Sequence, residues 1–148
     1  MLIQVLQQLF ARDLHRLKGE ILLYNDEKRI WYIEKNIANS AGNLCLHLVG
    51  NLNAYIGAEL GKTNYIRQRD LEFMLKDVPR VELVRRIDNT IEMIQQVLGE
   101  LPEETLASEY PSLVFDKPTT TEFLLVHLAT HLGYHLGQVN YHRRMLDN

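Results

Sequence analysis

Three histidines at successive turns of one segment are the residues best placed to do chemistry. His127, His131 and His135 follow one another at intervals of four residues. On a helix, residues four apart share a face and lie about 6 Å apart along the axis, so two imidazoles can reach one ion. Residues eight apart are separated by about 12 Å, too far for bonds of about 2.0–2.1 Å to one metal. One ion would therefore bind either His127 with His131 or His131 with His135.

A third ligand would have to come from another segment, and His47 is the candidate. Residues 36–58 and 123–142 contain no Asp, Glu, Lys or Arg over 23 and 20 residues, and His47 is the only histidine of the first segment. Because exposed helices usually carry charge on their outer face, we expect both segments to be covered on most sides. Buried imidazoles without partners would cost about 1–3 kcal/mol each. A metal ion, ordered water or a polar pocket has to satisfy them.

Three histidines with one open coordination position are typical of a catalytic rather than a structural zinc site. Asn43 and Asn51 stand four residues before and after His47, where their amides would support the ligand or line a pocket. The alternative interpretation is a polar core, or a histidine-lined pocket that holds no metal.

Other reactive side chains receive structural interpretations. Cys45 lies two residues from His47, on a different helix face, and is expected to be a small buried apolar residue. His142 precedes two arginines, which favours a solvated helix end. The segment 65–70 could rim a pocket, and Glu103, Glu104 and Glu109 could approach the site, but ordinary loop residues are the favoured interpretation of both groups.

Hydrophobic residues at spacings of three and four predict a chain that is helical nearly throughout. The stripes predict four helices, at residues 2–23 (or ending near Gly19), 40–60, 79–98 and 119–146. Gly61 and Gly99 are expected to end the second and third helices, and Thr119 with Glu122 to form the capping box of the fourth. Connections of 17 residues, 62–78 and 102–118, separate these helices. The simplest architecture is an all-α four-helix bundle.

Composition and charge limit the function classes. The chain has 148 residues, 46% of them hydrophobic and 24% charged, which predicts one globular domain over residues 1–148. A net charge of −3 with scattered Lys and Arg predicts no nucleic-acid or anionic membrane surface. The single cysteine fits a reducing compartment. Arg12 and Asp13 interrupt the N-terminal apolar run, which argues against a signal peptide, and Asn and His interrupt any membrane span. We expect a cytoplasmic protein.

The histidine motifs resemble those of the DinB/YfiT-like superfamily of metalloenzymes. His47 is followed far downstream by His131-Leu-Gly-Tyr-His135-Leu-Gly-Gln138, whose terminal His-x-Gly-Gln is characteristic of that superfamily. The segments 47–53 and 127–131 are similar to those of an uncharacterised DinB-like branch. The resemblance covers essentially the whole chain.

The resemblance implies a structure and a ligand set. The fold would be a four-helix bundle with long connections and helices ordered up-down-down-up, usually as a homodimer. His47, His131 and His135 would bind a divalent ion, nickel or zinc. Around this site, the neighbouring residues would be His127, Asn51, Tyr134 and Gln138. In the predicted helix 119–146, small residues recur at 129, 133 and 137, on the side away from His131 and His135. They would let an intrachain helix or a second copy come close.

The resemblance also implies an activity. Relatives include S-transferases that use bacillithiol and a mycothiol-dependent maleylpyruvate isomerase, and some relatives resemble hydrolases. The implied enzyme would use its metal to activate a low-molecular-weight thiol, or water, for attack on an electrophilic small-molecule substrate. The alternative function is a non-catalytic bundle whose histidine-lined pocket binds a small molecule or mediates assembly. No residue is predicted as the general base.

Overall fold

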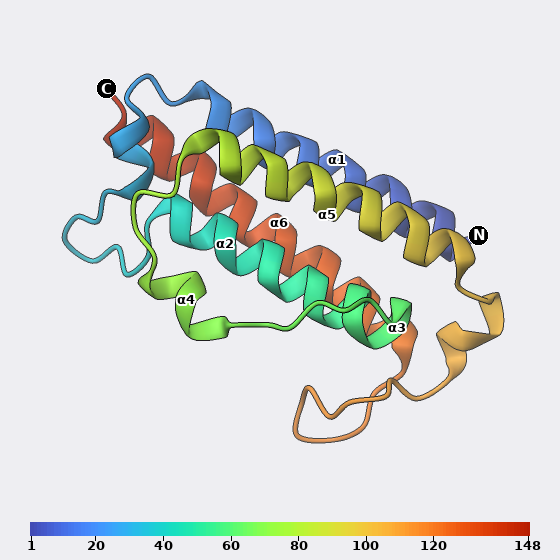
Figure 1. Cartoon of the computed structure of the whole chain (residues 1–148). Coiled ribbons are helices and arrows are strands. Elements are labelled where there is room, and N and C mark those ends of the chain that lie inside the picture. Colours follow the sequence, from blue (N-terminus) through green and yellow to red (C-terminus); the bar gives the residue numbers. More distant parts are fainter.

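Four long helices form the body of the protein in a computed structural model that describes residues 1–148. They are α1 (Leu2–Leu23), α2 (Ala41–Leu52), α5 (Arg80–Glu100) and α6 (Thr121–Leu146). Figure 1 shows that α1 and α6 run in one direction, while α2 and α5 run in the other. This all-helical arrangement has the up-down-down-up order that the resemblance implies. No helix is sufficiently long and apolar to cross a membrane.

Helix α1 packs antiparallel to α5 on one flank and parallel to α6 on the other. Near the start of α1, Gln7 and Gln95 each donate a side-chain hydrogen bond of 3.0 Å to the other's backbone carbonyl. Near its end, Glu20 accepts from Asn140 at 2.7 Å and from Arg143 at 2.6 Å. These contacts join α1 to α5 near its start and to α6 near its end.

The core is built from one apolar stripe of each long helix. In α1 the buried residues recur at spacings of three and four, at Leu6, Phe10, Leu14, Leu17 and Ile21. Every residue of α2 is buried, as its lack of charge predicted. The same expectation is wrong for α6, which exposes Tyr134 and Tyr141. Helix α6 lies at the edge of the bundle, where α1 and α2 contact it, and its outer face stays open.

Helix ends differ from the sequence expectations by a few residues. Ser40 caps α2, with its hydroxyl accepting from the Asn43 amide at 3.1 Å. The helix does not continue uniformly to residue 60, because a π-helical segment, Asn53–Ala58, precedes the short α3 (Glu59–Gly61). The left-handed residue that ends it is Lys62, at φ 54°, rather than Gly61. A Cβ at Gly61 would overlap Val97 of α5, so this glycine permits close helix packing.

The predicted start of the fourth helix and the predicted end of the third are also displaced. Thr120, not Thr119, caps α6 by accepting from the Phe123 amide at 3.1 Å. Thr119 instead precedes the helix, and its backbone carbonyl accepts from the Tyr110 amide at 2.9 Å. Helix α5 runs through Gly99 and ends at Glu100.

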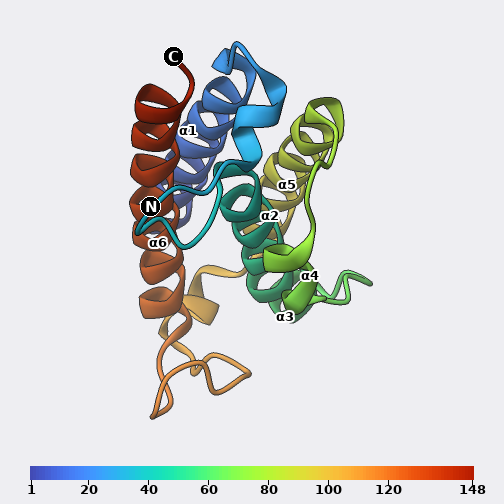
Figure 2. The ribbon, with the colours of Figure 1, turned by 90° about the vertical axis from the view of Figure 1, so that its left-hand side faces the viewer.

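The long connections contain short helices. The 3-10 helices Glu27–Trp31 and Glu103–Ala107 lie in the connections that precede α2 and α6. The connection from α3 to α5 contains α4 (Arg69–Met74), which Figure 2 shows lying against α2. The sequence predicted no helix there, and α4 turns out to contribute to the site.

Candidate metal centre

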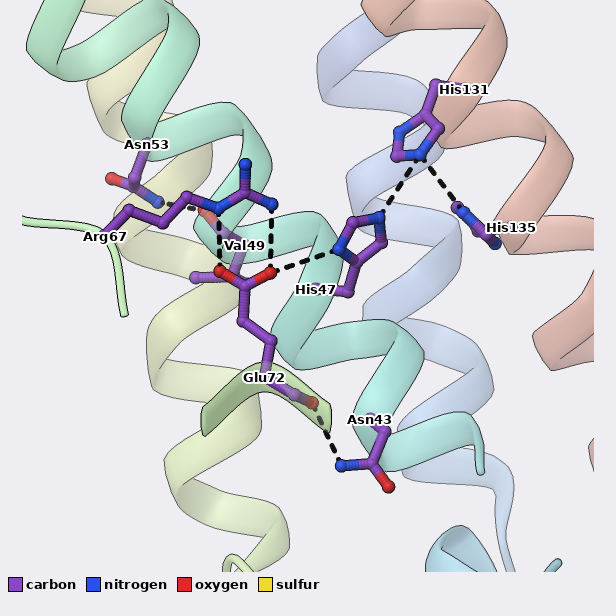
Figure 3. A network of polar contacts seen from close by, with 8 residues as sticks. All are labelled: Asn43, His47, Val49, Asn53, Arg67, Glu72, His131 and His135. Atoms are coloured by element: carbon purple, nitrogen blue, oxygen red, sulfur yellow. Dashed lines mark hydrogen bonds and ion pairs between the residues drawn. The ribbon is translucent and has the colours of Figure 1, made fainter. Parts of the chain in front are cut away.

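Helices α2 and α6 bring three histidine side chains together in their shared interface. The Nε2 atom of His131 lies 3.3 Å from Nε2 of His47 and 3.1 Å from Nε2 of His135 (Figure 3). One ligand atom from each of the three residues lies within 4.8 Å of the others. Tetrahedral ligands with bonds of about 2.0–2.1 Å are separated by roughly 3.3 Å. The two Nε2 separations therefore match those of imidazoles that share one ion.

His127 lies outside this group. Its ring stacks on His131 at a centroid distance of 6.3 Å, and it meets Phe115 edge to face at 4.9 Å. Helical spacing left open whether His131 would converge with His127 or with His135. The structure brings together His131 and His135, with His47 from α2, and leaves His127 as a neighbour of this group.

The outward nitrogens of two histidines have acceptor partners, and this determines their tautomers. Nδ1 of His47 lies 3.1 Å from Oε1 of Glu72, and Nδ1 of His135 lies 2.7 Å from Oε1 of Gln138. Carboxylate and carbonyl oxygens only accept, so both Nδ1 atoms donate and, in neutral rings, both Nε2 atoms are bare. These two lone pairs point at His131, whose Nδ1 is buried without a partner.

A metal ion would satisfy these three ring nitrogens better than hydrogen bonds among the rings can. A neutral His131 has one N–H, so a proton on its Nε2 can serve only one of the two bare neighbours well. An ion at the centre would satisfy all three Nε2 lone pairs at once. Outward hydrogen bonds to an acceptor, as seen for His47 and His135, are the usual arrangement of metal-binding histidines.

The surroundings of His131 and His135 favour their neutral imidazoles, which is the form that binds metal. Burial lowers the pKa of His131 to about 4, and the neighbouring His135 and His47 add to this. Burial also lowers the pKa of His135, against the opposing contact with Gln138. Protons therefore compete weakly with a cation for these two rings at neutral pH.

The remaining residues predicted near the site lie at different distances from the rings. Gln138 contacts His135 directly, and Tyr134 packs its ring 5.2 Å from His135 but is 66% exposed. Asn51 is buried, and its Oδ1 has no partner. Asn43 instead donates to the backbone carbonyls of Glu72 in α4 and of Leu75, the residue that follows α4.

Sequence reasoning missed the pair formed by Glu72 and Arg67. Glu72 is 6% exposed, and Arg67 donates to both of its oxygens, at 2.9 and 3.0 Å. Burial alone would raise the pKa of Glu72, but hydrogen bonds from His47 and Arg67 outweigh it and lower that pKa. The interpretation of residues 65–70 as ordinary loop packing is therefore wrong for Arg67. The one available signal was the lack of charged residues in α2, since a charged partner for its buried His47 then has to come from another segment.

Two other expectations have clear outcomes. Cys45 is fully buried, and burial raises the pKa of its thiol to about 12, so it is no nucleophile. His142 is buried rather than solvated, because it closes a contact between α6 and the end of α1. Its Nε2–H donates to the Tyr32 carbonyl at 2.9 Å, and its Nδ1 accepts from the Tyr24 hydroxyl at 2.6 Å.

A cavity opens beside the histidine group. It has a volume of about 510 Å³ and lies between the second half of α6 and residues 36–39. His135 and Gln138 form part of its wall, with Tyr134, Tyr141 and Met145. No Asp, Glu, Lys or Arg lines it. An uncharged molecule therefore fits this space better than a highly charged one.

Comparison with known proteins agrees with the architecture. The sequence profile of the DinB superfamily matches residues 6–139, which covers most of the chain and all three converging histidines. Comparison with curated proteins gives no match. From the extent of the family match, together with the all-helical bundle, this chain belongs to the DinB superfamily.

Proposed function

We propose that this protein is a divalent-metal-dependent enzyme in which His47, His131 and His135 hold one nickel or zinc ion. The observation that carries the proposal is the convergence of the three Nε2 atoms, with the Nδ1 atoms of His47 and His135 held outward by acceptors. When bound, such an ion would lower the pKa of a thiol or water at its open position, so that the nucleophile exists at neutral pH.

The surrounding residues orient the ligands and provide space for a substrate. Glu72 and Gln138 hold the imidazole tautomers, while Phe73, 5.0 Å from His47 between ring centroids, covers the ring. The uncharged cavity beside His135 would take the electrophile. In the transfer reaction, the thiol would give up its proton to bulk water, its sulfur would form a bond to the electrophilic carbon, and the leaving group would depart with the bonding electron pair. We propose a cytoplasmic low-molecular-weight thiol as the co-substrate.

We also propose that the protein acts as a homodimer that uses the groove between α1 and α6. This groove has a volume of about 630 Å³, and Gly19 and Gly137 lie in it. A Cβ at either glycine would meet nothing within 4 Å, so the groove has room for side chains from a second copy. Gly133 of α6 also lines the groove, where a Cβ would lie in ordinary contact with Asp13 of α1, at 3.9 Å.

Elemental analysis of untagged protein after dialysis tests the function. We expect about one nickel or zinc ion per chain. We also expect the loaded protein to consume monochlorobimane only when a small thiol is supplied. Protein that takes up neither metal after incubation contradicts the proposal, and the alternative of a metal-free binding or assembly module then replaces it. Metal retention without thiol-dependent turnover would leave the ion site but contradict the transferase activity.

A further inference from the structure

The connection between α3 and α5 places a buried carboxylate behind a candidate metal ligand. Oε1 of Glu72 lies 3.1 Å from Nδ1 of His47, on the side of the ring opposite His131 (Figure 3). The carboxylate accepts the Nδ1 proton, so the lone pair of His47 lies on Nε2 and points toward His131. A contact of this kind fixes both the tautomer and the rotation of an imidazole ring.

Arg67 holds that carboxylate in one orientation. Its Nε donates to Oε2 of Glu72 at 2.9 Å, and its Nη2 donates to Oε1 at 3.0 Å. Two parallel hydrogen bonds from a planar guanidinium restrict rotation of the carboxylate plane. Oε1 therefore stays in line with His47 while it also accepts from Arg67.

The backbone that carries Glu72 is fixed to α2 by a second set of contacts. The side-chain amide of Asn43 donates to the carbonyls of Glu72 and Leu75, at 3.0 and 2.8 Å. Lys76 donates to Oδ1 of the same Asn43 at 2.6 Å. Gly50 makes the close approach possible, because a Cβ there would overlap the Glu72 carboxylate.

We propose that Glu72, held by Arg67, is a positioning residue for His47, and that residues 62–79 are thereby part of the metal site. This inference rests on the proposed function for the identity of the ligand that His47 serves. Glu72 touches no ion itself. It acts by keeping the Nε2 lone pair of His47 directed at the point where the three imidazoles meet.

A purely structural ion pair would look similar, and the chain offers one for comparison. Glu20 pairs with Arg143 at 2.6 Å, with side-chain exposures of 13% and 22%, against 7% and 17% for Glu72 and Arg67. The Glu20 pair joins α1 to α6 and has no histidine partner among its hydrogen bonds. Substitution of Glu20 therefore controls for the loss of a half-buried ion pair.

The test compares Glu72→Ala and Glu72→Gln with Glu20→Ala by two measurements. Nitrogen-15 NMR of the metal-free protein reports which nitrogen of His47 carries the proton, and chelator competition gives the Kd for zinc. We expect the proton on Nδ1 in the unsubstituted protein and in Glu72→Gln, whose amide oxygen still accepts. In Glu72→Ala we expect a shift toward the Nε2–H tautomer and a Kd raised about 10- to 100-fold. Glu20→Ala should leave both measurements unchanged.

Two results would overturn the inference. One is a zinc Kd for Glu72→Ala equal to that of Glu20→Ala, and the other is a proton on Nε2 of His47 in the unsubstituted, metal-free protein. If Glu72→Ala does not fold, the double variant Glu72→Met/Arg67→Met replaces it, since it leaves no buried charge unpaired. If the unsubstituted protein binds no zinc, the proposed function fails, while the tautomer measurement still decides whether Glu72 orients His47.

Discussion

Nε2 of His47 and Nε2 of His131 lie 3.3 Å apart, although 84 positions separate the two residues in the chain. The contact exists because α2 and α6 pack side by side at the level of both rings. His135 extends the group by one helical turn.

The ligand set can be tested by exchanging its members one at a time. We expect His131→Ala to abolish metal retention, because Nε2 of His131 lies between the other two. We expect His127→Ala to spare most of it, because His127 only stacks on His131. The measurement is metal content per chain after dialysis. Equal loss in the two variants would show that the ligand set is wrong.

Removing the ion should destabilise the fold. A ligand that binds only the folded state adds RT ln(1 + [L]/Kd), about 2.7 kcal/mol when the free ligand is at about 100 times its Kd. We therefore expect a lower Tm in protein stripped by a chelator than in protein reloaded with zinc, measured by calorimetry. An unchanged Tm after metal loss has been verified would contradict this coupling.

A single methyl group should disturb the carboxylate behind His47. In Gly50→Ala the new Cβ would displace Glu72, although no charged residue is changed. We expect a zinc Kd raised about tenfold, as is typical when a residue behind a ligand is lost. The matched control is Gly19→Ala, where a Cβ meets nothing within 4 Å. Because both glycines lie within helices, a purely local effect would stabilise each helix by about 0.5–1 kcal/mol and leave the Kd unchanged.

The metal-free protein should lose stability in mild acid. Burial lowers the pKa of His142, against the opposing hydrogen bond to Tyr32, and burial lowers that of His131 to about 4. An unfolded histidine has a pKa near 6.5, so below about pH 6.5 the unfolded chain binds protons that the folded chain does not. The free energy of unfolding therefore decreases as the pH falls from about 7.5 to about 5.5.

Urea unfolding at the two pH values, in His142→Gln and in the unsubstituted protein, measures this effect. The variant should show a smaller decrease, since the contribution of His131 remains and that of His142 is gone. A decrease of the same size in both proteins would show that the buried His142 contributes nothing to the pH dependence.

The dimer proposal predicts a change of mass. Gly137→Leu would fill the open groove between α1 and α6, and we expect it to convert a dimer to a monomer in light scattering. Gln96→Leu, on the exposed side of α5, is the control that should leave the mass unchanged. A monomeric unsubstituted protein would contradict the proposal directly.

The bundle could be predicted from the sequence because local periodicity determines it. The stripe Leu6, Phe10, Leu14 and Leu17 predicts a buried helix face without knowledge of its partner. Helix ends were less predictable, since neighbouring threonines, 119 and 120, offer the same capping hydroxyl and only the backbone path selects one. The π-helix at Asn53–Ala58 was not predicted, because its apolar residues fit an ordinary helix equally well.

Helical spacing predicts that His131 meets a histidine one turn away, but it leaves His127 and His135 as alternatives, and only the family resemblance pointed to His135. The pair that supports His47 could not be predicted. Arg67 and Glu72 are five residues apart in a connection and share no helical face. Their meeting with His47 depends on how residues 62–79 fold over α2. The burial of His142 has the same origin, since its partners Tyr24 and Tyr32 lie more than a hundred residues away.

Because Glu72 lies on a connection, the candidate metal ligands and one of the residues that orient them belong to different parts of the chain. The bundle supplies the three imidazoles, while a stretch of chain outside its four long helices controls how one of them is presented. Exchange of residues 62–79 between related proteins would therefore retune the affinity or preference for an ion while every ligand stays the same.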